Sequence, residues 1–356
     1  MKMKRFEMTG VIPRPEWWLV RPDEIETVCR STVKGKCTQE AVTPAGFPVL
    51  RVIYGDYPQT GNPVNWSSAL GTGTPEIFGR QKDEPQTVLM AAGIHGCEIE
   101  GVILLLNLIS LLEKGVDLRG KPRPELVEGA SHYRLVLFPC VNMDGRAISP
   151  DHRLHADLDE CRRAGGGWWK DGTTIRWPKM KEFFPLPLDQ VGYPGGYPNS
   201  EGYNIQHDAS PGNIRTEEAR AILRAAEEKC ADLFLNFHSH PVSPDSIACG
   251  PQIYAGPANI AVGKELAKRC NRALTALDYP FDEKAEIEVT ASFNLNTAVQ
   301  FCCGAPAITF EIAGRDNTGF DRILETGYLW LETIFEYGQE KPFCDRAGRK
   351  KAEFNS

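Results

Sequence analysis

The pattern of apolar and polar positions along the chain predicts strands and helices in alternation. Short runs rich in β-branched and aromatic residues predict strands at 47–55, 87–93, 134–141, 231–239 and 306–314. Longer stretches predict a long apolar helix ending near residue 115 and further helices at 22–33, 216–230, 257–279, 290–303 and 320–337. The charged, proline-containing segment 119–130 predicts a loop. This order predicts an α/β fold with a mixed, mostly parallel central sheet flanked by helices on both faces.

Two long segments carry no clear periodicity and predict loop insertions near 56–86 and 147–204 within a single domain spanning 1–356. The second segment contains two glycine- and aromatic-rich runs, Gly165–Trp169 and Gly192–Pro198. Its aromatic content argues against disorder. A long ordered loop inside a compact domain is usually functional.

Composition excludes some classes of partner. The formal net charge is -7 and the isoelectric point is about 5.6, without a basic stripe, which argues against nucleic acid. The apolar runs are too short to span a bilayer, and the N-terminal residues lack the apolar core of a secretory signal. The odd count of 11 scattered cysteines indicates reduced thiols. We therefore expect a cytoplasmic protein without a membrane partner.

Polar residues stand at the ends of four predicted strands: His95, Asn142, His238 and Glu311. The carboxyl ends of parallel strands form one edge of a sheet, where ligands bind. Glu98 follows His95 by three residues at a strand-to-helix junction, and His238 comes much later in the chain. Two histidines and one glutamate form a known ligand set of catalytic zinc. The sequence thus predicts one Zn²⁺ held by His95, Glu98 and His238.

Glu311 lies in an otherwise apolar strand, where an unpaired carboxylate is costly to bury. It is the candidate general base that takes a proton from zinc-activated water and passes it to a leaving amine. Cys97 lies between two candidate ligands, but its neighbours are better placed to bind a metal. His240 would face the same way as His238 if the strand continues, near the substrate, or would otherwise be a loop residue. Each residue alone has an ordinary structural explanation, and only their combination predicts the site.

The order of these motifs resembles the zinc carboxypeptidase family over about residues 47–337. The motifs are His95-x-x-Glu98, the Asn142–Gly145 turn, the late His238 after a Leu-Phe-Leu strand, and Thr309-Phe310-Glu311. The resemblance implies zinc ligation by the two histidines and Glu98, a general base at Glu311, and a substrate-binding place for Asn142. Met143 stands where the family has proline.

The family's substrate-binding motif, approximately Gly-x-Asp-Leu-Asn-Arg-Asn, corresponds to Gly202–Asp208. Gln206 stands where asparagine is expected, and His207 where the resemblance implies an arginine that holds a terminal carboxylate. Histidine is mostly neutral at pH 7 and cannot make that forked contact. Gln206 and His207 are predicted to bind substrate with altered carboxylate recognition. His207 is alternatively a surface loop residue.

The resemblance also implies an arginine, a short way after the Asn142 turn, that polarises the scissile carbonyl. Arg163 is our candidate for this catalytic residue, and Arg162, Arg153 and Arg176 are alternatives.

The resulting hypothesis is a metallocarboxypeptidase-like zinc hydrolase that cleaves an amide bond in a peptide-like or small-molecule substrate. One alternative is an N-acyl amino acid deacylase similar to the aspartoacylase branch of the same fold. Others are a zinc-binding relative without turnover and a plain α/β domain without metal.

Overall fold

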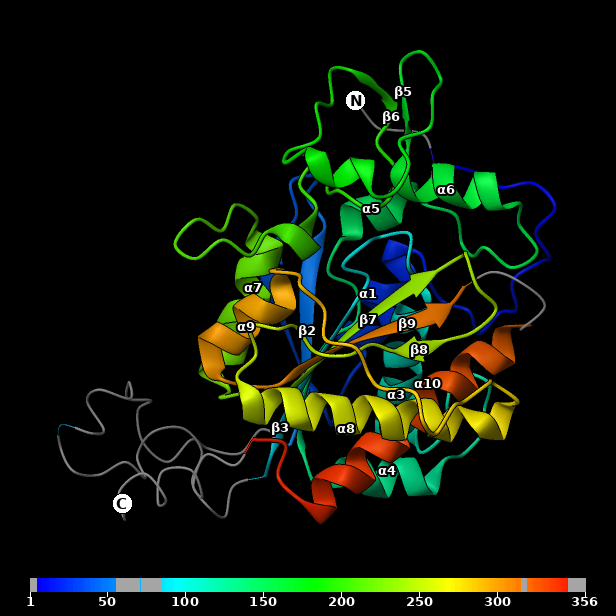
Figure 1. The fold of residues 1–356 in the computed structure, drawn as a ribbon. Helices are drawn as coiled ribbons and strands as arrows, with labels where there is room; N and C mark the ends of the chain where they lie inside the picture. The colour runs from blue at the N-terminus through cyan, green and yellow to red at the C-terminus, as the bar shows by residue number, and fades with distance from the viewer. Residues whose placement is uncertain (1–4, 56–70, 72–84, 315–318, 345–356) are drawn as a thin grey trace.

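The computed structural model describes residues 5–55, 71, 85–314 and 319–344. A seven-stranded sheet with the order β1-β2-β4-β3-β7-β9-β8 runs through the molecule (Figure 1). The pairs β4–β3, β3–β7 and β7–β9 are parallel, and the outer pairs are antiparallel. The predicted α/β fold with a mixed sheet is confirmed. The strands are β1 (Lys36–Val42), β2 (Pro48–Tyr54), β3 (Thr87–Ala92), β4 (Arg134–Phe138), β7 (Leu233–His240), β8 (Ile247–Ala248) and β9 (Ala307–Ala313).

Helices cover both faces of the sheet. One face packs against α1 (Pro22–Arg30), α3 (Glu100–Lys114), α4 (Pro124–Ser131), α8 (Pro257–Ala273) and α10 (Gly319–Glu340). The other packs against α7 (Glu217–Glu228) and α9 (Leu295–Cys303), which lie together at the left of Figure 1. In β3, Val88 and Met90 belong to the first core, whereas Leu89 and Ala91 belong to the second. The central strands therefore read as continuous apolar runs, because both faces are buried.

Two features of the sequence prediction are corrected. Segment 119–130 is not all loop, because α4 begins at Pro124 and buries Leu126 and Ala130, four residues apart, on one side. Proline is well tolerated at the first helical position, so its presence does not exclude a helix. The edge strands β1 and β8 were not predicted, since β1 is half-exposed and largely polar and β8 has only two residues.

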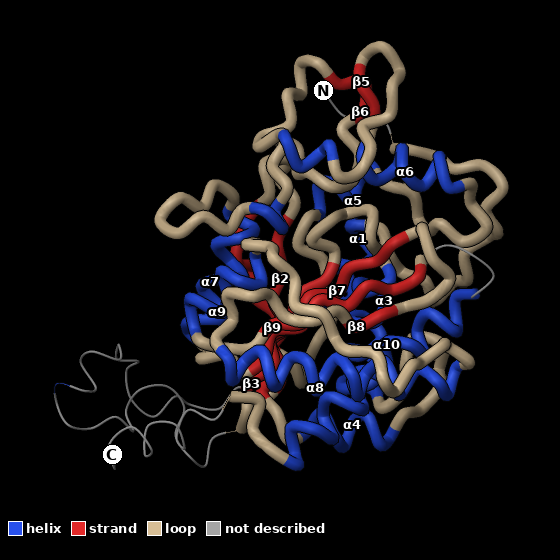
Figure 2. The backbone as a smooth tube through the Cα atoms, in the orientation of Figure 1, coloured by secondary structure: helices blue, strands red, loops and turns tan. Residues whose placement is uncertain are grey.

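The predicted insertion at 147–204 is a small ordered lobe, in which short elements stand between long irregular stretches. It contains α6 (Leu158–Gly166), the hairpin of β5 (Trp168–Trp169) and β6 (Val191–Tyr193), and the short helix η2 (Lys179–Glu182). The hairpin lies above α5 (Met143–Ile148) and α6 at the top of Figure 2. A separate apolar cluster, formed by Ile175, Leu186 and Val191, holds it together. The insertion near 56–86 falls almost entirely outside the described residues.

In the part of the chain that the structure describes, no helix has the length and apolar character needed to cross a membrane.

Glu218, in the first turn of α7, is a buried acid with incomplete hydrogen bonding. Asn199 Nδ2 donates to its Oε1 at 3.2 Å, while its Oε2 has no partner among the described residues. Burial, followed by the charges of Asp144 and Glu201, raises the pKa of Glu218 to about 7. The ionised form of this side chain is therefore destabilised in the folded protein.

We expect Glu218→Gln to stabilise the protein at pH 8 but not near pH 4.5. The unfolded chain ionises this residue near its ordinary pKa, whereas the folded chain keeps the proton to about pH 7. Wild-type stability therefore falls as pH rises across that window. Glutamine keeps the acceptor for Asn199 and carries no charge, so the free energy of unfolding should rise by about 2 kcal/mol at pH 8.

Urea unfolding at the two pH values measures the difference. The control is Glu217→Gln, since the neighbouring Glu217 side chain is 50% exposed and should change stability by less than about 0.5 kcal/mol. Equal stability of wild type and Glu218→Gln at pH 8 would contradict the argument.

Candidate metal centre

The α7/α9 face of the sheet changes from apolar to polar toward the carboxyl ends of β7 and β9. Phe234 in β7 and Ala307 in β9 belong to the core under α7 and α9. Further along the same face, β7 presents Asn236 and His238, and β9 presents Glu311. His238 and Glu311 are direct partners in the parallel register of these strands. The sheet thus sets an imidazole beside a carboxylate.

The structure brings His95, Glu98 and His238 together. All three are buried, and their candidate ligand atoms lie within 4.8 Å of one another. Glu98 Oε1 lies 3.0 Å from His95 Nδ1, and Oε2 lies 2.8 Å from His238 Nδ1. The backbone N–H of Ser239 also donates to Oε2 at 3.3 Å. The turn between β3 and α3 supplies two of these side chains, and β7 supplies the third.

The tautomer of His95 indicates that this cluster fits a cation. His95 Nε2 lies 3.1 Å from Asn204 Oδ1, which also accepts the backbone N–H of Gln206 at 3.1 Å. Because a backbone N–H points at it, this Asn204 atom is the amide oxygen, and His95 Nε2 must carry the proton. A neutral His95 then turns the lone pair of Nδ1 toward the Glu98 carboxylate. Two acceptors at 3.0 Å need a positive charge between them, either a proton or a metal ion.

Burial disfavours a second proton on His95, which favours a metal ion between His95 and Glu98. Burial lowers the pKa of His95 even though the Glu98 charge acts in the opposite direction. Burial also opposes ionisation of Glu98, but the two imidazoles outweigh it and lower the pKa of that carboxyl. At His238 the Glu98 charge and hydrogen bond outweigh burial and raise the pKa. Two imidazole nitrogens and an ionised carboxylate match the ligand chemistry of zinc.

Glu311 stands next to this cluster with part of its surface accessible. Burial, and next the charge of Glu98, raises the pKa of Glu311 to about 7. A carboxylate with this proton affinity suits general base catalysis near neutral pH.

Asn142 has both of its polar groups engaged with the protein. Its Oδ1 accepts the N–H of Gly145 at 2.8 Å and caps α5, and its Nδ2 donates to the carbonyl of Tyr197 at 3.1 Å. It is fully buried. Its predicted contact with substrate stays a prediction, and its contacts in the structure fix the segment that carries Tyr197.

Gln206 and His207 lie in the short helix η3 (Ile205–His207), next to Asn204. Gln206 Oε1 accepts from Asn236 Nδ2 at 2.9 Å, and its amide nitrogen has no hydrogen-bond partner among the described residues. Burial, then the charges of Lys181, His95 and His238, lower the pKa of His207 to about 4. His207 is thus neutral at pH 7, half-buried, and influenced by the charges of the metal cluster. Substrate binding by both residues stays a prediction.

The predicted catalytic Arg163 has its contacts within the hairpin lobe. Its guanidinium lies 4.3 Å from the Trp168 ring centroid and donates to Gly172 O and Thr174 Oγ1 at 3.2 and 3.4 Å. None of these contacts joins Arg163 to the metal cluster, and its predicted catalytic role stays a prediction. Arg162 pairs with Asp159 at the surface.

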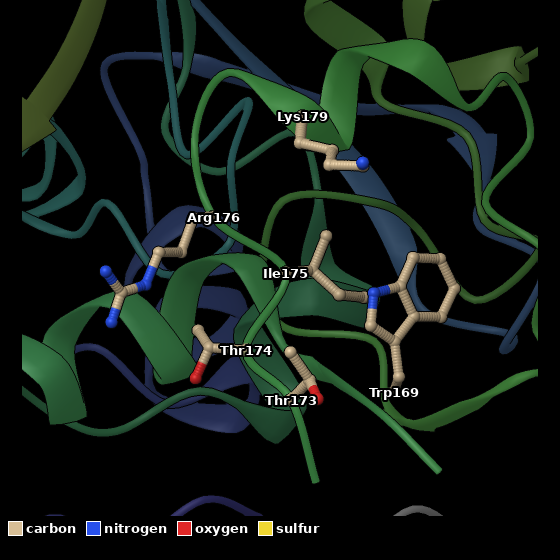
Figure 3. Close-up of a pocket in the computed structure, with 6 residues that line it drawn as sticks. All are labelled: Trp169, Thr173, Thr174, Ile175, Arg176 and Lys179. Atoms are coloured by element: carbon tan, nitrogen blue, oxygen red, sulfur yellow. The ribbon is translucent and has the colours of Figure 1, made fainter. Parts of the chain in front are cut away.

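Arg176 borders a separate hollow of about 430 Å³ in the lobe. In Figure 3 its side chain points away from Trp169, while Ile175 faces the indole. The hollow is lined by Trp169, Thr173, Thr174, Ile175, Arg176 and Lys179. Neither Glu311 nor any of the three candidate metal ligands contributes to it.

Of the remaining candidates, His240 is occupied by its own loop, since its Nε2 lies 3.1 Å from Asp245 O. Cys97 is buried, and burial raises the pKa of its thiol to about 12, so it is a poor metal ligand at neutral pH.

Sequence reasoning missed Asn204 and Tyr197. Asn204 lies inside the substrate-binding motif that the sequence identified, which was the available signal. The ring centroid of Tyr197 lies 4.3 Å from that of His95, and its glycine-rich segment was the only hint.

Arg153, an alternative candidate for the electrophile, is instead an internal support of the metal cluster. Its Nη2 lies 3.2 Å from Glu100 Oε2 and also donates to Ser239 Oγ. Ser239 bonds both Glu100 and, through its backbone N–H, Glu98. Arg153 and Glu100 are at most 2% exposed, so neither can meet a substrate without a rearrangement. The opposite charges of Arg153 and Glu100 neutralise each other next to the candidate metal ligands.

We expect Arg153→Met to destabilise the fold by about 3 kcal/mol or more, because Glu100 would be left as a buried, unpaired carboxylate. The double variant with Glu100→Gln should lose less than the sum of the single variants, since it removes both charges. Urea unfolding provides the free energies.

Arg272→Met is the matched control, because Arg272 and its partner Glu283 are both more than half exposed. It should change stability by less than about 1 kcal/mol. If Arg153→Met cost no more than this control, the buried pair would not support the site.

Comparison with known proteins identifies a family and a fold. The model of the zinc carboxypeptidase family matches residues 66–320. No curated protein sequence matches the chain. Solved metallo-carboxypeptidase structures share its fold. A metallo-carboxypeptidase from Burkholderia cenocepacia is 14% identical, with a TM-score of 0.55 over 89% of this chain and 68% of that chain.

The second is a metallo-carboxypeptidase from Pseudomonas aeruginosa, solved in complex with (2-guanidinoethylmercapto)succinic acid. It is also 14% identical, with a TM-score of 0.53 over 89% of this chain and 68% of that chain. At 14% identity, the likeness to these two structures shows a shared fold and nothing about activity. The family match covers well over half of the sequence and supports a metallopeptidase-like hydrolase. The chain belongs to the zinc carboxypeptidase family.

Proposed function

We propose that this protein is a zinc-dependent hydrolase that cleaves an amide bond in a peptide-like or acylated small-molecule substrate. The observation that carries the proposal is the buried His95–Glu98–His238 cluster, which needs a positive charge at its centre, with Glu311 beside it in the sheet register. In this proposal these three residues hold a single Zn²⁺ and Glu311 is the general base.

Zinc in such a site supplies a Lewis acid that polarises a carbonyl and lowers the pKa of water. The protein's own residues carry the protons. Glu311 accepts a proton from the attacking water and donates it to the leaving amine. Its half-accessible position at the strand end lets it reach a substrate, and its raised pKa lets it both accept and release a proton near pH 7.

The substrate class follows from the residues that replace the family's carboxylate clamp. Neutral His207 offers one hydrogen-bond donor and one acceptor, and Gln206 offers an amide N–H. Neither provides the charged fork with which arginine holds a peptide's terminal carboxylate. This favours substrates that do not depend on such a fork. It also keeps N-acyl amino acid deacylation as a second candidate function.

We expect zinc to stabilise the wild-type protein. At a free zinc concentration 100 times the dissociation constant, the gain is about 2.7 kcal/mol. His238→Ala should lose this gain and the bound metal, because one of three ligands is removed. Metal analysis after dialysis and thermal unfolding with and without a chelator measure both effects.

The control for zinc binding is His132→Ala, since His132 lies on the surface with its side chain 50% exposed. It should bind zinc like the wild type. Purified wild type that carries no zinc and melts at the same temperature with and without chelator would favour a plain α/β domain.

We expect the zinc-loaded wild type to hydrolyse members of a panel of C-terminal peptides and N-acyl amino acids, and Glu311→Gln to lower kcat by about 10²–10⁴. The variant should keep its zinc, because Glu311 is not a proposed ligand. Release of free amine measures turnover, and the exposed Glu286→Gln is the control with unchanged activity.

The substrate profile separates the candidates. Turnover of peptides supports a carboxypeptidase-like activity, and turnover restricted to N-acyl amino acids supports a deacylase. A zinc-loaded protein that cleaves nothing in the panel would identify a binding protein without turnover.

A further inference from the structure

Tyr197 brings a phenol to the metal cluster from the glycine-rich segment of the lobe. Its ring centroid lies 4.3 Å from that of His95, with the planes at 72°, in an edge-to-face contact. The ring also lies against Gly165 at the end of α6, where a Cβ atom would stand only 2.7 Å from Tyr197 Cε2. The ring is therefore held by a proposed zinc ligand and by the backbone of the lobe.

The backbone around Tyr197 is fixed just as closely. Its N–H donates to Gly165 O at 3.2 Å, and its carbonyl accepts from Asn142 Nδ2 at 3.1 Å. The preceding Gly196 accepts the N–H of Gly96, in the turn that carries His95, at 2.7 Å. A Cβ at Gly196 would stand 2.7 Å from Cys97 Cβ, so this close approach requires glycine. Tyr197 and the His95 turn are thus held as one unit.

Tyr197 is only partly buried, and its hydroxyl makes no hydrogen bond with the residues that the structure describes, so it is available to a ligand. The ordinary pKa of a phenol is about 10, so the hydroxyl keeps its proton at neutral pH and can act as a donor.

We propose that Tyr197 is a further catalytic residue, whose hydroxyl donates a hydrogen bond to the substrate's carbonyl oxygen as negative charge develops on it. This role rests on the hydrolase function proposed above. The phenol keeps its proton throughout, so it makes and breaks no covalent bond. Arg153 and Arg163 were candidates for polarising the substrate carbonyl, but the guanidinium group of each is hydrogen-bonded to another part of the protein. In this proposal the Tyr197 hydroxyl polarises that carbonyl.

The test compares Tyr197→Phe with the wild type, both loaded with zinc. The phenyl ring keeps its contacts with His95 and Gly165, so the fold and the zinc content should be unchanged. We expect kcat to fall by about 10²-fold with little change in KM, as for the loss of one oxyanion donor. Tyr254→Phe is the control, because Tyr254 is 49% exposed and packs against Phe293, and it should keep full activity.

A second measurement is independent of turnover. Calorimetric titration with methylphosphonate, a tetrahedral anion, should give an affinity about 10-fold lower for Tyr197→Phe than for the wild type. Equal affinity together with unchanged kcat would overturn the proposal, and a defect confined to Tyr197→Ala would show that only the ring matters. If the wild type cleaves no amide yet the phenylalanine variant binds methylphosphonate more weakly, the proposed function fails while the donor role of Tyr197 stands.

Discussion

The candidate metal centre depends on the hydrogen bond between His95 Nε2 and Asn204 Oδ1. This bond fixes the imidazole tautomer, because the same oxygen also accepts the backbone N–H of Gln206. The remaining lone pair of His95 must then face Glu98, and a proton or a metal ion has to lie between them. The corresponding position in the family motif is aspartate. A neutral amide sets the same tautomer without adding a negative charge, so it makes the imidazole a less basic ligand than a carboxylate partner would.

A series of hydrogen-bonded side-chain amides connects the segment that carries Asn204 to the sheet. Gln206 Oε1 accepts from Asn236 Nδ2, which also donates to Asn296 Oδ1 at 2.7 Å, and Asn296 Nδ2 donates to Thr309 Oγ1 at 2.8 Å. This series joins η3, β7, α9 and β9 directly under the polar face. Asn236 Oδ1 has no partner among the described residues, so the network is not fully satisfied, but its hydrogen bonds link these four elements. Gln206 therefore has a positional role in addition to its predicted contact with substrate, since it anchors the segment that carries Asn204.

Sequence reasoning could find what depends on chain order and strand position. The central strands were predictable because both of their faces are buried, and His95, Glu98 and His238 stood out because each lies near a strand end of the parallel region. It could not find contacts that arise only when distant segments pack together. The pairing of Arg153 with Glu100, and the contact of Tyr197 with His95, join segments more than 50 residues apart without a motif of their own. The polar edge strand β1 was missed because half-exposed strands lack the apolar run on which the prediction relied.

Arg163 illustrates how the same residue type can be used for its shape as well as its charge. Spacing from the Asn142 turn made it a candidate electrophile, yet its guanidinium stacks on Trp168, whose ring stacks in turn on Tyr193 at 4.6 Å between centroids. Planar stacking of this kind is a property of arginine that lysine lacks. It holds the hairpin against the end of α6, where Gly165 receives the Tyr197 ring. In this arrangement the contacts of Arg163 lie within the lobe and its catalytic role stays a prediction, whereas the ring of Tyr197 lies against His95.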